Sequence, residues 1–182
     1  MTTYFLSTME NTSTAVTTTA VGIRYGLLVG LASVIFTFIL FATGQEGNVP
    51  LSLLGMVIWI VGVVLAHKFF KANNGGFMSY SQGLGIGTLL SAVSGVLGAI
   101  FRYVYMEFID PSATQRGMDL ARAKLETQGM DDAQIDQAVA MSQKFSSGPI
   151  GLVIAIISSI VLGFILSLII SAITKRNRPE FE

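Results

Sequence analysis

Four apolar runs of membrane-spanning length constrain the fold of this 182-residue chain more than any other feature of its sequence. They occupy residues 21–42, 49–70, 80–105 and 149–174. A helix needs roughly 20 residues to cross the hydrocarbon core of a bilayer, and each run is that long. None of them alternates between apolar and polar residues, as the strands of a membrane barrel do. The sequence therefore predicts an all-α, polytopic membrane protein with four transmembrane helices.

The composition and charge of the chain are typical of a protein embedded in a lipid bilayer. Apolar residues make up 52% of the sequence and charged residues 12%, whereas soluble domains contain about 25% charged residues. Eleven basic side chains balance eleven acidic ones, so net charge does not indicate nucleic acid as a partner. The chain has no cysteine, which excludes a disulfide framework, thiol catalysis and a lipoprotein anchor.

The segments outside the apolar runs are expected to differ from one another. Residues 1–20 lack a basic n-region and a continuous apolar h-region, so they predict a disordered tail and not a cleaved signal peptide. Residues 21–175 form the transmembrane domain, and 176–182 a short tail. Basic residues close to the spans lie on one side of the membrane, which by the positive-inside rule places both termini in the cytoplasm. They are Arg24, Lys68, Lys71, Lys175, Arg176 and Arg178.

The long acidic loop at 107–148 has the signals of a helical hairpin on the extracytoplasmic side. Asp110, followed by proline, is typical of a helix start, and Gly129 of a helix end. Asp131 and Gln134 have the spacing of a capping box for a second helix. Two interpretations remain open, a cap packed on the end of the bundle and a lid over a binding site.

Small residues recur at four-residue spacing in the first, third and fourth spans, which predicts close helix packing because little hydrophobic force acts between helices in lipid. Such a stripe drifts around a straight helix, so the fourth span should either contact different neighbours at its two ends or wrap around one. The alternative is a substrate path lined by small polar groups. The expected helix-packing glycines are Gly22, Gly26, Gly30, Gly83, Gly87, Gly95, Gly151 and Gly163.

Two ionisable residues within the spans are candidates for a functional or interfacial role. Arg102 lies near the outer end of the third span, where it should snorkel towards the headgroups and reach Glu107. His67 lies near the inner end of the second span and is expected at the interface; as the only histidine, it has no second histidine with which to share a metal. We expect neither a metal nor a cofactor.

The glycine-rich stretch "KANNGGFMSYSQGLGIG" at 71–87 predicts two separate features. Its first half suits a tight turn, since positive φ is accessible to glycine and tolerated by asparagine. Ser79 or Ser81 then caps the third span. "GLGIG" opens a membrane helix without a βαβ unit around it, which argues against a nucleotide loop.

Several motifs together resemble a bacterial membrane-protein family, the domain of unknown function 4199. They are "RYGLLVGLASVIFTFILFATG", "NNGGFMSYSQG", "FIDP" and "QGMDDAQIDQAVAMSQKF", in that order, and the resemblance extends over residues 20 to 175. It implies a small protein of the bacterial inner membrane with four helices and no established biochemical role. It supplies no catalytic residues.

The sequence therefore predicts a non-enzymatic structural or protein-interaction component of the inner membrane. Its expected partners are the lipid bilayer, a second copy of the chain or another membrane protein. No nucleophile elbow or HExxH motif indicates catalysis. The alternative is a small transporter or channel, although no span carries an Asp or Glu at its middle or an interrupting proline.

Overall fold

The computed structural model describes residues 16–146 and 148–179, and these residues form helices joined by short connections. Most of the tail predicted at 1–20 lies outside the described residues, as do the last three residues of the chain. In chain order the helices are α1 (Thr18–Ala42), α2 (Val49–Ala72), α3 (Tyr80–Val104), the π-helix η1 (Tyr105–Ile109), α4 (Ser112–Thr127), α5 (Asp132–Ser146) and α6 (Gly148–Thr174).

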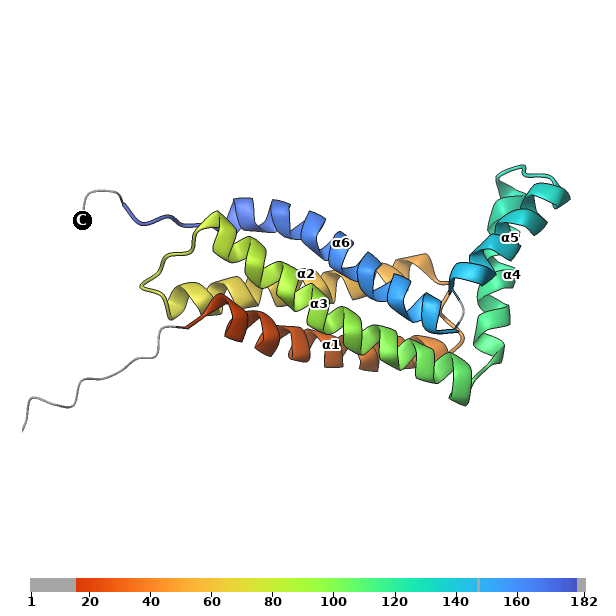
Figure 1. The fold of residues 1–182 in the computed structure, drawn as a ribbon, viewed down its shortest axis with the longest axis horizontal. Coiled ribbons are helices and arrows are strands. Elements are labelled where there is room, and N and C mark those ends of the chain that lie inside the picture. The colour runs from red at the N-terminus through yellow and green to blue at the C-terminus, as the bar shows by residue number, and fades with distance from the viewer. Residues whose placement is uncertain (1–15, 147, 180–182) are drawn as a thin grey trace, which may run out of the picture.

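Four of these helices, α1, α2, α3 with η1, and α6, are long and apolar enough to cross a membrane. They lie side by side along the long axis of the molecule, and α4 and α5 stand across one end as a hairpin (Figure 1). The start of α1 and the end of α6 lie at the opposite end, beside the turn between α2 and α3. This arrangement confirms the predicted all-α fold with four spans and a hairpin between the third and the fourth.

Side-chain caps set the helix boundaries. Thr17 accepts a hydrogen bond from the backbone of Ala20 at 3.1 Å, so α1 begins at Thr18 and takes three residues from the segment expected to be tail. At the start of α3, the Ser79 hydroxyl accepts from the Gln82 amide at 3.2 Å, and the Gln82 side chain accepts from the Ser79 amide at 2.8 Å. Of the two serines expected to cap this span, Ser79 does so.

The turn between α2 and α3 is a glycine turn. Gly75 and Gly76 have φ values of +65° and +85°, a conformation that a side chain disfavours. Asn73 keeps a negative φ of −101°, and the Asn74 side chain donates to the Phe77 carbonyl at 2.9 Å. The asparagines therefore cap and brace the turn, while glycine alone supplies the left-handed backbone.

Helix α1 packs on α3 through its three glycines. A Cβ added to Gly22 would lie 2.9 Å from the Cβ of Leu89, and one added to Gly26 would lie 2.7 Å from the Cβ of Val93. Gly30 is opposed by Leu97 in the same way. Each glycine of α1 thus receives a branched side chain of α3, and the two backbones approach closely as expected of small residues in lipid.

The contact between α3 and α6 is a ladder of glycine and serine, which we call the glycine–serine seam. At each rung one helix contributes a glycine whose added Cβ would meet the serine side chain of the other helix. Four residues separate successive rungs on both helices, so α6 follows α3 over the whole seam and wraps around one neighbour. The rungs are Gly83 with Ser171, Gly87 with Ser167, Ser91 with Gly163, and Gly95 with Ser159.

Gly151 has a different environment from the other glycines expected to pack spans together. A Cβ at Gly151 would overlap the backbone of Ser146, the last residue of α5, and not a neighbouring span. Nearby, at the start of α6, Gly148 has a φ of +61°. Gly151 therefore permits a tight junction between the hairpin and the last span.

An arginine attaches the hairpin to the loop between α1 and α2. Arg116 of α4 donates to Glu46 of that loop at 2.7 Å and to Asp110 at 2.8 Å. Beside it, the side chain of Leu120 packs over Gly47, and Ala113 is buried against Tyr105. These contacts hold α4 against the end of the bundle, as the cap interpretation requires.

The two carboxylates of this attachment are stabilised in their charged form. The hydrogen bond from Arg116 holds the pKa of Asp110 below its ordinary value, with a second contribution from Ser112. Burial raises the pKa of Glu46, but hydrogen bonding and the positive charge of Arg116 outweigh this effect, and the net pKa is lowered. The same two carboxylates raise the pKa of Arg116, which stays charged.

Acidification should loosen α4 from the α1–α2 loop. Carboxylates with lowered pKa values stabilise the folded state above their unfolded pKa, and this contribution is lost as the pH falls through the folded pKa, below about pH 4. Between pH 7 and pH 3, exchange of the α4 amides at 113–120 should accelerate roughly twofold to fivefold beyond its intrinsic pH dependence, as for other exposed ion pairs. Hydrogen exchange followed by mass spectrometry measures this change.

Two arginine variants serve as controls for the acid effect. Arg116→Ala should exchange quickly at pH 7 and show no further acceleration in acid. Arg122→Ala removes only the ion pair with Asp136, inside the hairpin. Its α4 amides should still exchange faster at pH 3 than at pH 7, as in the natural sequence. If exchange of the α4 amides still accelerates in acid in Arg116→Ala, the acceleration does not come from the ion pairs of Arg116.

Candidate functional site

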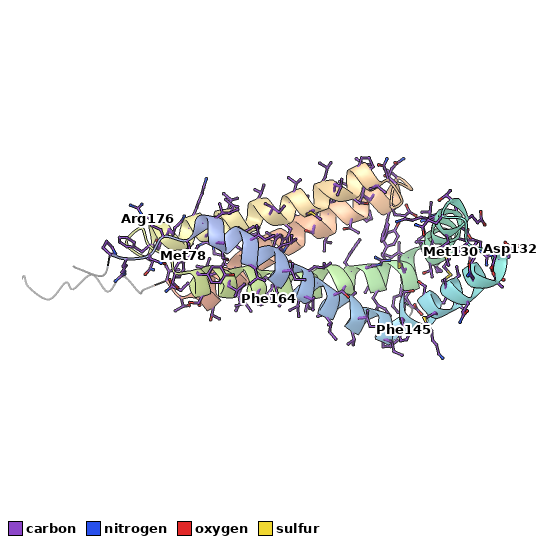
Figure 2. The ribbon with its side chains drawn as sticks, turned by 90° about the horizontal axis from the view of Figure 1, so that it is seen from above. Met78, Met130, Asp132, Phe145, Phe164 and Arg176 are labelled. Carbon is purple, nitrogen blue, oxygen red and sulfur yellow. The ribbon has the colours of Figure 1, made fainter. Side chains whose placement is uncertain are left out.

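A cleft of about 380 Å³ lies where the bundle meets the hairpin, and we call it the hairpin cleft. Its walls come from the end of α3, from η1, from α4 and α5, and from the start of α6. Phe145, which lies at the junction of α5 with the bundle in Figure 2, contributes to the apolar lining together with Met106, Leu152 and Ile154. Arg102, Tyr103, Glu107, Thr114 and Ser142 supply polar groups.

The π-helix η1 forms part of the cleft wall and contributes Glu107 to it. Its wide turn is closed by a hydrogen bond from the Asp110 amide to the Tyr105 carbonyl at 2.8 Å. Glu107 of η1 lines the same cleft as Arg102 of α3. Tyr105 is buried, with its ring centroid 4.9 Å from that of Phe41, and this packing holds η1 in place.

Arg102 and Glu107 share the cleft without forming the ion pair that the sequence predicts. Within the described part of the chain, the ion pairs involve other residues, and both of these side chains are exposed. The structure thus places a guanidinium and a carboxylate next to one apolar wall, with neither neutralised by the other. This arrangement is suited to a ligand that carries both charges.

His67 lies far from the cleft, at the turn end of the bundle. It is fully buried; its Nε2 donates to the Gly83 carbonyl at 2.9 Å, and its Nδ1 lies 2.8 Å from the Thr174 hydroxyl. Lys71, one turn further on, donates to the Thr174 carbonyl at 2.9 Å. His67 therefore joins α2 to α3 and α6, which differs from the expected interfacial position because its polar ring finds its partners inside the bundle.

Aromatic rings hold the basic residues at the same end. The guanidinium of Arg24 lies 4.9 Å from the ring centroid of Phe69, and that of Arg176 lies 5.7 Å from the ring of Phe77. Met78 and Arg176 exchange backbone hydrogen bonds of 2.8 Å in both directions, and the two lie together in Figure 2. The tail after α6 is thus fixed against the α2–α3 turn and adds its positive charge there.

A smaller crevice of about 220 Å³ opens along the spans between α2 and the seam. Ser94 and Ser159 line it, and the indole of Trp59 donates to the Ser91 hydroxyl at 3.1 Å. No group of three His, Asp or Glu side chains that could hold a metal ion occurs among residues 16–146 and 148–179. The hairpin cleft, in contrast, combines an apolar lining with the charged groups of Arg102 and Glu107.

These features first define a class: the chain is a multi-pass membrane protein whose four apolar helices are long enough to cross a bilayer. A family model described as "Protein of unknown function (DUF4199)" matches residues 24–176, and the chain belongs to this family. The match confirms the resemblance of the turn and outer-loop motifs. No curated protein and no solved structure matches the chain. The family description names no activity, so a role must be argued from the geometry.

Proposed function

We propose that this chain is a non-enzymatic interaction component of the bacterial inner membrane, and that it binds another membrane constituent at its hairpin end. The hairpin cleft carries this proposal, since it joins an apolar wall to two separate charges at the end of the spans. Association of two copies through the small-residue faces is not part of the proposal. Contacts within one chain already fill those faces, α1 on α3 and α3 on α6.

Photocrosslinking from the cleft tests the proposal. A benzoylphenylalanine at Ser142, an exposed position that lines the cleft, should yield a defined adduct in native membranes. The same residue at Leu28, which is 55% exposed on the outer face of α1, is the control for random contact with the bilayer. Identical adduct patterns from the two positions would contradict a specific interaction at the hairpin end.

The proposed orientation places both termini and the α2–α3 turn in the cytoplasm. It is supported by the basic residues gathered at the turn end, under the positive-inside rule. The natural chain has no cysteine, so the labelling of a single introduced cysteine shows on which side of the membrane that position lies. Ala123→Cys in α4 should react with an impermeant maleimide in spheroplasts, whereas Ala72→Cys should react only after lysis. The reverse pattern would overturn this orientation.

A small transporter or channel is the second candidate, favoured by the serine-lined crevice beside Trp59. For transport, this crevice must admit water from one side of the membrane. A cysteine at Ser94 should then react with a small impermeant thiol reagent. Protection of that cysteine in folded protein, together with its reaction after unfolding, would remove the transport candidate.

A further inference from the structure

Arg102 and Glu107, which form no ion pair with the residues that the structure describes, lie near the end of their span. Arg102 and Glu107 belong to the last turns of a 30-residue span, Tyr80–Ile109. Because about 20 residues suffice to cross the hydrocarbon, the end of such a span reaches the headgroup layer. A guanidinium there meets the phosphates of the surrounding lipids, and a carboxylate meets an ammonium group only where the lipid headgroup carries one.

The apolar part of the cleft continues onto the surface that faces the acyl chains. Ile154 lines the cleft and is 37% exposed, and Ile150, one turn before it on α6, is 59% exposed. On the other side Phe108 of η1 is 73% exposed. A molecule that places its polar end between Arg102 and Glu107 can therefore extend its hydrocarbon along α6.

Charge complementarity selects among the amphiphiles that could occupy this site. A phosphate is a good partner for a guanidinium, and a primary ammonium can donate hydrogen bonds to a carboxylate. A headgroup with negative charge alone would leave Glu107 unpaired and repelled. A quaternary ammonium has no N–H to donate.

We propose that the hairpin cleft binds a zwitterionic phospholipid whose headgroup ends in a primary ammonium, with its phosphate on Arg102 and its ammonium on Glu107. The proposal rests on the proposed interaction at the hairpin end and names the constituent bound there. In this complex Arg102 and Glu107 are bridged by the headgroup, which accounts for two opposite charges that share one cleft without pairing.

Lipid titration of the purified full-length chain in a mild detergent tests this assignment. Dioleoyl phosphatidylethanolamine, phosphatidylcholine and phosphatidylglycerol are added separately, and bound lipid is counted by native mass spectrometry. The ethanolamine lipid should bind roughly tenfold more tightly than the other two, the difference expected of one charge-assisted hydrogen bond. Glu107→Gln should abolish this preference, and Arg102→Gln should weaken binding of all three lipids.

Control variants keep the test specific. Glu126→Gln and Lys124→Gln remove the same charges at exposed positions of α4 that do not line the cleft, and should leave binding unchanged. Ser142→Trp should fill the cleft from α5 without touching either charge, and should also abolish the preference. A melting temperature without lipid verifies that each variant is folded.

Several results would overturn the assignment. They are equal binding of the three lipids by the natural sequence, tighter binding of phosphatidylglycerol, or a preference that survives in folded Glu107→Gln or Ser142→Trp. A protein adduct from Ser142 combined with no lipid preference would overturn the lipid assignment alone and leave the proposed interaction at the hairpin end intact. If neither a specific adduct from Ser142 nor a lipid preference is found, both the lipid assignment and the proposed interaction at the hairpin end are wrong.

Discussion

Replacing Gly95 by leucine should separate α3 from α6 and prevent the bundle from accumulating in its folded form. A Cβ at Gly95 would already overlap the side chain of Ser159, and both residues belong to helices that cannot move apart without breaking the other rungs. Overpacking of this kind costs about 3 kcal/mol or more, the upper part of the usual range. Gly163→Leu should have a similar effect against Ser91. Thermal unfolding in detergent, with expression level as a second readout, measures the loss.

Gly85 supplies a matched control on the same helix. A Cβ at Gly85 meets no heavy atom within 4 Å, so Gly85→Leu should be neutral or slightly stabilising because leucine favours the helix. A second control exchanges the partners of one rung. Gly95→Ser alone should destabilise, whereas Gly95→Ser combined with Ser159→Gly reproduces the arrangement of Ser91 and Gly163 and should recover most of the loss. If Gly85→Leu destabilises the protein as much as Gly95→Leu, close packing in the glycine–serine seam is not the cause of the loss.

Replacing His67 by alanine should destabilise the turn end of the bundle by roughly 1–3 kcal/mol, from a buried cavity and lost hydrogen bonds between helices. The ring is fully buried and reaches partners on two other helices, Gly83 and Thr174. Among the residues that the structure describes, its removal leaves the hydrogen bond from Lys71 to Thr174 between α2 and α6 at this end. Unfolding in a denaturant series and hydrogen exchange at 170–174 measure the effect.

Two further substitutions separate the causes. His67→Phe keeps a ring in the space but removes both hydrogen bonds, so the difference between this variant and His67→Ala isolates the packing contribution. Lys68→Ala changes the exposed neighbour and should have almost no effect. A loss of stability in Lys68→Ala as large as in His67→Ala would indicate sensitivity of the whole segment and not of the buried imidazole.

The spans and the hairpin could be predicted from sequence because their signals are local. Hydropathy over about 20 residues defines a span, and the spacing of Asp131 and Gln134 defines a helix start that the structure reproduces with mutual hydrogen bonds of 2.9 and 3.3 Å. The glycine turn at Gly75 and Gly76 follows from backbone conformation alone. In each case, the residues that decide the structure lie within a few positions of one another.

The attachment of the hairpin and the cleft beside it could not be predicted to the same extent, because their residues meet across long sequence separations. Arg116 reaches Glu46, 70 positions away, and no pattern in either segment marks the pair. The π-helix at Tyr105–Ile109 is a second case, because an interpretation from residue spacing assumes an α-helix throughout. The expected ion pair of Arg102 with Glu107 does not form among the described residues, and the His67 ring is buried against α3 and α6; both outcomes depend on tertiary contacts that no local pattern marks.

The single reversed rung of the glycine–serine seam has a consequence for register. Three rungs place glycine on α3 and serine on α6, whereas the rung of Ser91 and Gly163 places them the other way round. If α6 slid along α3 by four residues, Ser91 would face Ser159 or Ser167, and the two serine side chains would clash. At another level two glycines would face each other and leave an unfilled space. An all-glycine helix against an all-serine helix would permit such a step. The reversed rung thus favours one register of α6 against α3. Because the hairpin is joined to α6, this register also sets the position of the hairpin along the bundle axis.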